Sequence, residues 1–323
     1  MDKHVHDTAE DQRYGHRPVL LDECLEALNI RGDGIYIDGT LGRAGHSLEI
    51  ARRLTTGRLI SIDRDETAIE AAKERLKDYM DHVTLVHSNF DRVGEILEEL
   101  NISGVDGMLF DLGVSSPQLD EAQRGFSYMN DAPLDMRMDR TAYLTARHVV
   151  NEWSYEELRR ILFDFGEERY APAVARGICR AREVAPIETT AQLVDIIKSS
   201  MPPAALREKQ HPAKRSFQAI RIAVNGELDA LPPMLDAATR GLKSGGRLAV
   251  ITFHSLEDRI VKQTMRDLAT GCTCPPEFPV CVCGNKPKLT LVSRKPIVSG
   301  AAELEENPRA RSAKLRVAER TQF

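Results

Sequence analysis

The stretch Ile35-Tyr-Ile-Asp-Gly-Thr-Leu-Gly-Arg-Ala-Gly-His-Ser47 decides the fold. Four strand-like residues lead into three glycines, and a helix-forming segment follows. Glycines at such a point let the backbone turn tightly and let a ligand approach without meeting a Cβ atom. Their spacing, at Gly39, Gly42 and Gly45, differs from the G-x-G-x-x-G pattern that cradles a dinucleotide pyrophosphate. The ligand expected here is therefore not defined by a pyrophosphate.

A second stretch, Arg58-Leu-Ile-Ser-Ile-Asp-Arg-Asp65, places Asp63 where the next parallel strand should end. A carboxylate there can accept hydrogen bonds from both hydroxyls of a ribose. Asp38, just before the first glycine, suits a cofactor that has a sulfonium cation and an amino acid moiety but no phosphate. Together these residues indicate a site for an adenosine-containing cofactor such as S-adenosylmethionine, and the alternative is an ordinary tight turn.

Strand-like and helix-like segments alternate around these two stretches. We expect strands at 35–39, 58–63, 82–87 and 105–111, with helices over about 45–54 and 66–79 and a helical face from 93 to 100. Repeated βα units with short connections predict a parallel sheet with right-handed crossovers. Ligands of such sheets bind beyond the carboxyl ends of the strands. The glycine loop, Asp63, Asn89-Phe90 and Asp111 all fall there.

Between residues 120 and 210 the strand pattern stops. Ser154-Tyr-Glu-Glu157 and Thr189-Thr-Ala-Gln192 are capping boxes, each followed by apolar residues at helical spacing. Next come a helical face from 217 to 228, interrupted by Pro232-Pro233, and strand-like segments at 247–253, 288–293 and 314–318. We predict a doubly wound, Rossmann-like α/β domain split by an all-helical insert: a disordered terminus at 1–15, a first part at 16–119, the insert at 120–210 and a second part at 211–323.

Composition and charge limit the class of protein. The chain has 323 residues, of which 42% are hydrophobic and 29% charged, as in soluble globular proteins. The polar start resembles no signal peptide and no apolar run is long enough to span a bilayer, so we expect a cytoplasmic protein. The net charge of −5 argues against indiscriminate binding to nucleic-acid backbones. The basic groups at 214–215 and 309–320 either contact RNA or form solvated faces.

Four of the six cysteines lie in Cys272-Thr-Cys274 and Cys281-Val-Cys283. Four thiols on a short loop can form a tetrahedral zinc site, although the usual spacing is C-x₂-C. The alternative is a proline-rich hairpin whose thiols stay reduced in the cytosol. Cys24 and Cys179 fall in helical patterns and are expected to be small core residues.

Six motifs occur in order: Gly39-Thr-Leu-Gly-Arg-Ala-Gly-His-Ser47, Asp111-Leu-Gly-Val-Ser-Ser-Pro-Gln118, Pro133-Leu-Asp-Met-Arg-Met138, His211-Pro-Ala-Lys-Arg-Ser-Phe-Gln-Ala-Ile-Arg221, Phe253-His-Ser-Leu-Glu-Asp-Arg259 and Glu306-Asn-Pro-Arg-Ala-Arg311. From about His16 to its end, the chain closely resembles the bacterial small-subunit ribosomal RNA (cytosine-N4) methyltransferases, the RsmH or MraW family. The resemblance implies a class I methyltransferase sheet and S-adenosyl-L-methionine as cofactor. It also implies methylation of N4 of a cytidine in the decoding (P-site) region of 16S rRNA within the small ribosomal subunit, with the insert recognising the substrate.

By motif position, the resemblance implies cofactor contacts at seven residues: Ala44, Gly45, His46, Asp63, Phe90, Asp111 and Gln118. Asp63 would bind the ribose hydroxyls, Phe90 would pack on the adenine, and Asp111 and Gln118 would line the methionine side. Taken alone, Phe90 is more often a core aromatic. His46 should be neutral, because the start of a helix disfavours a cation. His254 is either a pocket residue or a helix cap.

No metal site is assigned, since the resemblance gives zinc no support, and no catalytic base is assigned either. Amino-methyltransferases commonly carry an Asp/Asn/Ser-Pro-Pro-aromatic loop after the strand that ends at Asp111, and Ser115-Ser-Pro-Gln118 is only loosely similar. The acceptor for the amine is therefore Asp111, a serine hydroxyl or a backbone carbonyl. A small-molecule methyltransferase, a non-catalytic RNA-binding protein and an NAD(P) enzyme remain open alternatives. The sequence suggests neither a membrane nor a DNA partner and leaves the oligomeric state open.

Overall fold

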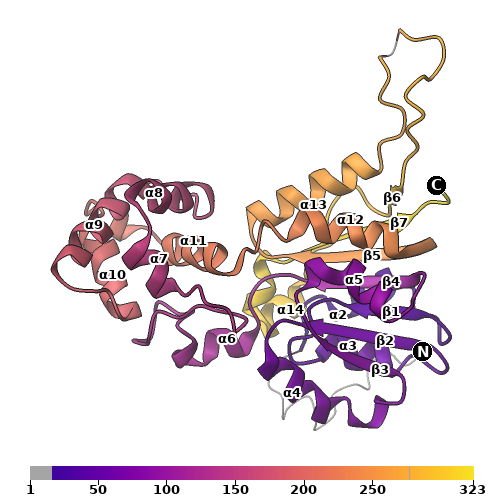
Figure 1. Ribbon diagram of the computed structural model, residues 1–323, viewed down its shortest axis with the longest axis horizontal. Helices are drawn as coiled ribbons and strands as arrows, with labels where there is room; N and C mark the ends of the chain where they lie inside the picture. Colours follow the sequence, from indigo (N-terminus) through magenta and orange to yellow (C-terminus); the bar gives the residue numbers. More distant parts are fainter. Residues whose placement is uncertain (1–16, 276) are drawn as a thin grey trace. The chain divides into compact units, whose positions relative to one another are not determined.

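The computed structural model describes residues 17–275 and 277–323, and Figure 1 shows their helices and strands. The chain forms two compact units. The sheet unit consists of the described residues 17–113 together with Leu228–Phe323, and the helical unit is Val114–Glu227. The terminus at 1–15, which we expected to be disordered, lies outside the described residues.

A seven-stranded mixed sheet forms the centre of the sheet unit. The strand order is β3-β2-β1-β4-β5-β7-β6. Neighbouring strands from β3 to β5 run parallel, and β7 runs antiparallel to both β5 and β6. Chain order reverses between β1 and β4, which is where open α/β sheets bind ligands. The strands are β1 (Ile35–Asp38), β2 (Arg58–Asp63), β3 (Val83–His87), β4 (Val105–Asp111), β5 (Leu242–Thr252), β6 (Leu289–Leu291) and β7 (Lys314–Arg320).

Helices cover both faces of this sheet. Because successive strand residues point to opposite faces, Tyr36 and Ile37 belong to two different cores. The core of Tyr36 includes residues of α2, α3 and α4, and that of Ile37 includes residues of α5, α12 and α13. The predicted doubly wound fold is thereby confirmed. The helices are α2 (Leu21–Leu28), α3 (Gly45–Ala51), α4 (Glu66–Arg75), α5 (Val93–Glu99), α12 (Leu231–Gly241), α13 (Ser255–Leu268) and α14 (Ala301–Glu306).

Two details of the sheet unit differ from the sequence prediction. Strand β5 begins at Leu242 instead of residue 247, because extra residues of β5 opposite the step from Val105 to Gly107 let Leu242 pair with Val105. The helix predicted to run to residue 228 ends at Asn225, where Gly226 adopts a left-handed φ of 58°. Pro232-Pro233 does not interrupt that helix but lies in the first turn of α12, where a missing N–H costs no hydrogen bond.

Helices build the second unit, and all of its residues are described. They are α6 (Ser116–Asp120), α7 (Ala146–Glu152), α8 (Tyr155–Asp164), α9 (Ala171–Val184), α10 (Thr190–Ser199) and α11 (Lys214–Asn225). This unit contains no strand, only one isolated bridge between Pro133 and Thr189. The predicted capping boxes at Ser154 and Thr189 start α8 and α10. Among the described residues of the whole chain, no helix is long and apolar enough to cross a membrane.

The helical unit extends beyond the insert that we placed at 120–210. Helix α11, which we assigned to the second part of the methyltransferase domain, packs instead through Phe217, Ile220 and Val224 into the core of the helical unit. The apolar spacing of a helix predicts that one face is buried. It does not say against which core.

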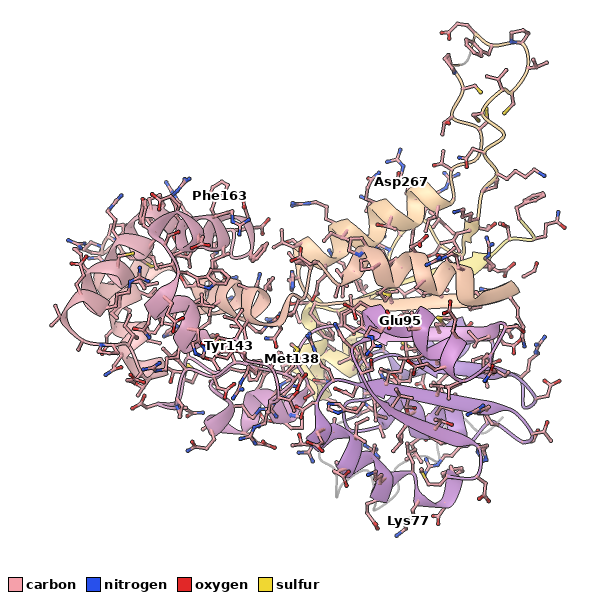
Figure 2. All side chains as sticks on the ribbon, in the orientation of Figure 1. Lys77, Glu95, Met138, Tyr143, Phe163 and Asp267 are labelled. Atoms are coloured by element: carbon pink, nitrogen blue, oxygen red, sulfur yellow. The ribbon has the colours of Figure 1, made fainter. Side chains whose placement is uncertain are left out.

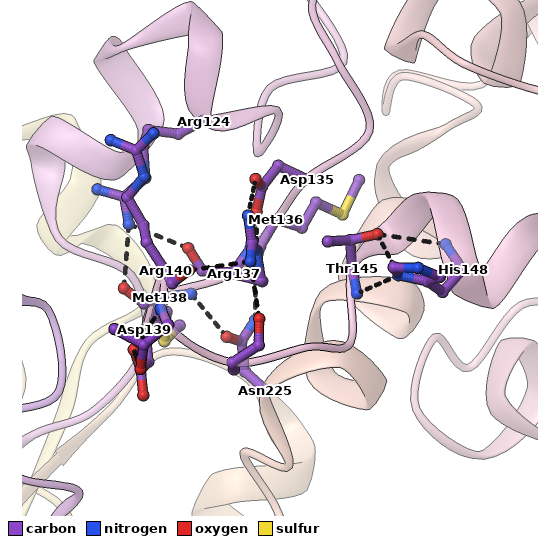
Figure 3. Close-up of polar contacts among 12 residues, drawn as sticks. Arg124, Asp135, Met136, Arg137, Met138, Asp139, Arg140, Thr145, His148 and Asn225 are labelled. Atoms are coloured by element: carbon purple, nitrogen blue, oxygen red, sulfur yellow. Dashed lines mark hydrogen bonds and ion pairs between the residues drawn. The ribbon is translucent and has the colours of Figure 1, made fainter.

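Hydrogen bonds fix the Pro-Leu-Asp-Met-Arg-Met motif inside the helical unit (Figure 3). The Asp135 carboxylate accepts two 2.8 Å hydrogen bonds from the Arg137 guanidinium. The Asn225 side chain donates to the Met136 carbonyl and accepts from the Met138 amide, both at 2.8 Å. Since Asn225 ends α11, this network joins the motif to that helix.

Candidate cofactor-binding site

The loop between β1 and α3 needs its glycines for backbone shape and close packing. Gly42 has a φ of 49° and Ala44 one of 59°, both in the left-handed region. A Cβ atom on Gly39 would collide with the ring of Phe110 in β4. The glycine spacing therefore brings the loop backbone directly onto the carboxyl end of the sheet.

Asp38, at the end of β1, holds this loop in place. One carboxylate oxygen accepts from the Ser47 hydroxyl at 2.7 Å, and the other accepts from the Thr40 amide at 3.2 Å. The Ser47 hydroxyl lies 2.8 Å from that of Ser61 in β2, so Asp38 ties the first turn of α3 to the sheet. Burial raises the pKa of Asp38 to about 6.

Asp63, at the end of β2, also holds the loop. Its Oδ2 accepts from the Gly42 amide at 2.7 Å, and its Oδ1 accepts from the Asp65 amide at 2.8 Å. Burial raises the pKa of Asp63 to about 6 despite these two bonds. A carboxylate oxygen has two lone pairs, so each oxygen can still accept from a ligand hydroxyl.

His46 lies buried at the start of α3. Its Nε2 is 3.1 Å from the Val19 carbonyl, so Nε2 carries the hydrogen and Nδ1 is the acceptor. Burial lowers the pKa of His46 to about 4, which leaves the ring neutral near pH 7, as the sequence predicted. The segment before α2 also packs on this turn, because Pro18 occupies the space that a Cβ on Gly45 would fill.

Asp111, at the end of β4, has the most unusual surroundings of the predicted residues. Its amide donates to the Thr40 hydroxyl at 2.6 Å, and its Oδ2 lies 3.9 Å from Nδ1 of His46. Its Oδ1 is buried and has no hydrogen-bond partner among the described residues. Burial, reinforced by the negative charges of Asp38 and Glu257, raises the pKa of Asp111 to about 8.

A buried carboxylate oxygen without a partner is costly, and such groups mark functional sites. The Asp111 side chain is still 26% exposed, so a ligand can reach it. The negative charges of neighbouring carboxylates favour a ligand with positive charge and hydrogen-bond donors. The sulfonium and ammonium groups of S-adenosylmethionine fit this requirement.

Phe90 forms part of the core next to the site. It is 9% exposed, and its ring meets that of Phe110 edge-on, with centroids 6.2 Å apart. This environment agrees with the reading of Phe90 as a core aromatic. Its packing on an adenine stays a prediction.

Gln118 and His254 both take part in helix capping. Gln118 belongs to the helical unit, where its buried side chain accepts from the Ser115 amide at 3.0 Å in the capping box of α6. Its predicted contact with the cofactor is therefore untested. His254 caps α13, and its Nε2 lies 3.0 Å from Oε1 of Glu257, which agrees with the helix-cap alternative.

Sequence reasoning missed the hydroxyls of Thr40 and Ser47 and the segment 17–19. Thr40 follows Asp38 by two residues, and that spacing is typical of a turn closed by an aspartate side chain. This signal could have identified Thr40. Nothing in the local sequence indicates that Val19 contacts His46, because 27 residues separate them.

The strand order, the glycine loop and the carboxylates at three neighbouring strand ends agree with the predicted Rossmann-like methyltransferase fold, whose methyl donor is S-adenosylmethionine. The chain belongs to the MraW methylase family, whose model matches residues 13–321. It is 57% identical over 308 residues to a protein of Brevibacillus brevis, covering 95% of this chain and 98% of that protein. It is also 57% identical over 304 residues to a protein of Symbiobacterium thermophilum, covering 94% and 96%. Both relatives are named Ribosomal RNA small subunit methyltransferase H.

The solved structures that match are more distant in sequence. An rRNA methylase from Streptococcus thermophilus matches with a TM-score of 0.42 and 10% identity, covering 95% of this chain and 99% of that one. A methyltransferase from Streptococcus mutans in complex with SAH matches with a TM-score of 0.41 and 9% identity, covering 93% and 97%.

Proposed function

We propose that this methyltransferase modifies N4 of a cytidine in the decoding (P-site) region of 16S rRNA, within the small ribosomal subunit. The Oδ1 of Asp111, which is buried beside the glycine loop and unpaired within the described part of the chain, carries the argument for the cofactor site. Near-complete coverage of relatives named Ribosomal RNA small subunit methyltransferase H supports ribosomal RNA as substrate. The six motifs support the choice of N4 of cytidine.

The site residues have distinct roles in this proposal. Asp63 would bind the ribose hydroxyls with its remaining lone pairs while it holds the glycine loop. Asp111 would face the positive groups of the cofactor, and Ala44, Gly45 and neutral His46 would form the adjoining wall. Phe90 is proposed to support the adenine and Gln118 the methionine side. Bound S-adenosylmethionine supplies an electrophilic methyl group.

The residues of the chain then act mainly by alignment. The exocyclic amine of cytosine is a weak nucleophile because its lone pair is conjugated into the ring. Holding this nitrogen in line with the methyl carbon and the sulfur can contribute roughly 7–11 kcal/mol. An acceptor on the amine would favour sp³ geometry and stabilise the positive charge that develops. Asp111 is one candidate for this acceptor, and a serine hydroxyl at 115 or 116 or a backbone carbonyl is another.

The helical unit is proposed to bind the RNA. Tyr143 and Phe163, labelled in Figure 2, are 78% and 64% exposed, and exposed aromatic rings are surfaces on which unpaired bases stack. This unit has as many basic as acidic residues, so the surplus of negative charge belongs to the rest of the chain. The target base must leave its stack to reach the methyl group.

The test uses small ribosomal subunits from cells that lack this protein. Subunits are incubated with the full-length chain and S-adenosylmethionine, and rRNA fragments are mapped by mass spectrometry. We expect one added methyl group on a cytidine of the decoding region, at N4. Methylation of free nucleosides but not of subunits would favour the small-molecule alternative, and a methyl group at another position would refute the N4 assignment.

A further inference from the structure

The connection between α13 and β6 is a long loop whose described residues form no helix or strand (Figure 1). None of its described residues from Gly271 to Pro287 is buried, and Phe278, Val280 and Val282 are exposed. Ordering a loop of this length costs conformational entropy, which buried apolar surface normally offsets. The described part of this loop has no such core, so another interaction must define its shape.

Two Cys-x-Cys pairs meet across this loop. The four Sγ atoms of Cys272, Cys274, Cys281 and Cys283 all lie within 4.8 Å of one another. The Sγ of Cys283 is 3.5 Å from that of Cys281 and 3.8 Å from that of Cys272. Four sulfurs, each about 2.3 Å from a tetrahedral zinc ion, would be about 3.8 Å apart. A disulfide needs about 2.0 Å, and all four cysteines are free.

Backbone amides point at these sulfurs. Such donors stabilise the negative charge of thiolates and orient metal ligands. The Cys274 sulfur accepts two of these hydrogen bonds, the Cys283 sulfur accepts two, and the Cys272 sulfur accepts one. The donors are the amides of Val282 and Cys283 at 3.3 Å, of Thr273 and Asn285 at 3.4 Å, and of Cys274 at 3.4 Å.

The base of the loop is closed as well. The Asn285 side chain donates to the Gly271 carbonyl at 2.7 Å and lies 3.3 Å from the Thr270 carbonyl. These bonds join the end of the loop, after the second cysteine pair, to its start, before the first pair. The two cysteine pairs therefore face each other on a closed loop, as metal ligands do in small zinc-binding loops.

We propose that Cys272, Cys274, Cys281 and Cys283 bind one zinc ion, and that this ion folds the loop. Soft thiolates in a tetrahedral set select zinc or iron, and zinc suits an exposed site because it has no redox chemistry. A cluster with two irons would hold the two pairs further apart than these sulfurs lie. The short Cys-x-Cys spacing, which looked unfavourable in the sequence, brings both sulfurs of a pair into reach of one ion. None of these cysteines belongs to the proposed cofactor site.

The first test measures metal content. The full-length chain, free of metal-binding tags, is purified under reducing conditions and its zinc is determined by elemental mass spectrometry. We expect about one zinc ion per chain. The zinc content of the double variant Cys281→Ser/Cys283→Ser should be at least about tenfold lower, because two of the four ligands are removed. The matched control Cys179→Ser removes a thiol of α9 and should keep its zinc.

The second test does not depend on a variant. Cobalt(II) added to the metal-free, reduced wild-type chain should give the visible absorption of a tetrahedral tetrathiolate complex, and zinc should remove it. Zinc should also protect four thiols from alkylation and protect the loop from limited proteolysis. Unchanged S-adenosylmethionine binding would show that the double variant is folded.

Four outcomes would overturn the proposal. These are a reduced chain without zinc and without the cobalt spectrum, bound iron in place of zinc, disulfides between these cysteines after purification under reducing conditions, and full zinc content in the double variant. If the double variant failed to fold, the cobalt spectrum of the wild-type chain would still decide.

Discussion

Cofactor affinity should depend on pH through Asp111. The pKa of this buried carboxyl group is about 8 in the free protein, so near pH 7 most molecules carry a proton there. A sulfonium or ammonium group close to Asp111 favours its ionised form, and binding should therefore release the proton. If only the ionised form binds, about 1% of the protein is competent at pH 6 and about 9% at pH 7. The affinity for S-adenosylmethionine should thus rise about tenfold per pH unit over this range.

Neighbouring groups add to this slope or leave it unchanged. Asp38 and Asp63, each with a pKa of about 6, titrate in the same direction below pH 7. The pKa of His46 is about 4, so its ring stays neutral throughout. The 3.9 Å separation between Nδ1 of His46 and Oδ2 of Asp111 is compatible with a proton on the carboxyl group.

Isothermal titration calorimetry can test this prediction. Titrations at pH 6.0, 6.5 and 7.0 give the slope, and buffers with different ionisation enthalpies give the number of protons released, expected near 0.9 at pH 7. Asp111→Asn keeps the size of the side chain but removes the charge, so it should bind weakly and lose most of the slope. Equal affinity at pH 6 and 7 without proton release, or the full slope in the Asn variant, would refute the reasoning.

Three further predictions concern other parts of the molecule. Asp63→Ala should weaken S-adenosylmethionine binding at least about tenfold, because the variant loses two charge-assisted hydrogen bonds to the ribose and the bonds to the Gly42 and Asp65 amides. An unchanged dissociation constant would refute the ribose assignment. Replacing the helical unit by a short linker should abolish methylation of ribosomal subunits and largely spare cofactor binding, whereas equal loss of both would indicate a structural role. Arg316 pairs with Asp258 at 2.7 Å, so Arg316→Ala should lower the melting temperature and leave the salt dependence of RNA binding intact. In the matched variant, replacing exposed Arg311 by Ala should instead flatten that salt dependence by up to about one unit of log-log slope, with little change in melting temperature.

Local patterns predicted the elements of the fold, because strand alternation, capping boxes and glycine turns act over a few residues. The capping boxes at Ser154 and Thr189 start their helices as predicted. The unit to which α11 belongs was not predictable, since its apolar face fits either core. The position of β7 was not predictable either. Strand β7 lies between β5 and β6, although it follows both of them in the chain.

For single side chains too, the sequence does not predict contacts between segments that are far apart in the chain. The end of β2 predicted that Asp63 would point at the cofactor side. Its bond to the Gly42 amide, 21 residues away, depends on how two strand ends meet. From its sequence neighbourhood, Arg316 was grouped with the basic residues that either contact RNA or form a solvated face. Its partner Asp258 lies in α13, 58 residues earlier, so only the folded chain distinguishes it from the exposed Arg311.

The carboxylates at this site make the free protein less stable as pH rises. The raised pKa of Asp111 means that the native state binds more protons than the unfolded state between pH 4 and 8, so the free energy of unfolding falls as pH rises through this window. Asp38 and Asp63 contribute in the same direction up to about pH 6. A cationic ligand removes this penalty, so S-adenosylmethionine should raise the melting temperature more at pH 7.5 than at pH 6. Scanning calorimetry with and without the cofactor measures both effects. In Asp111→Asn the free protein should lose stability less steeply between pH 6 and 7.5, and a stability profile identical to that of the wild-type chain would contradict the raised pKa.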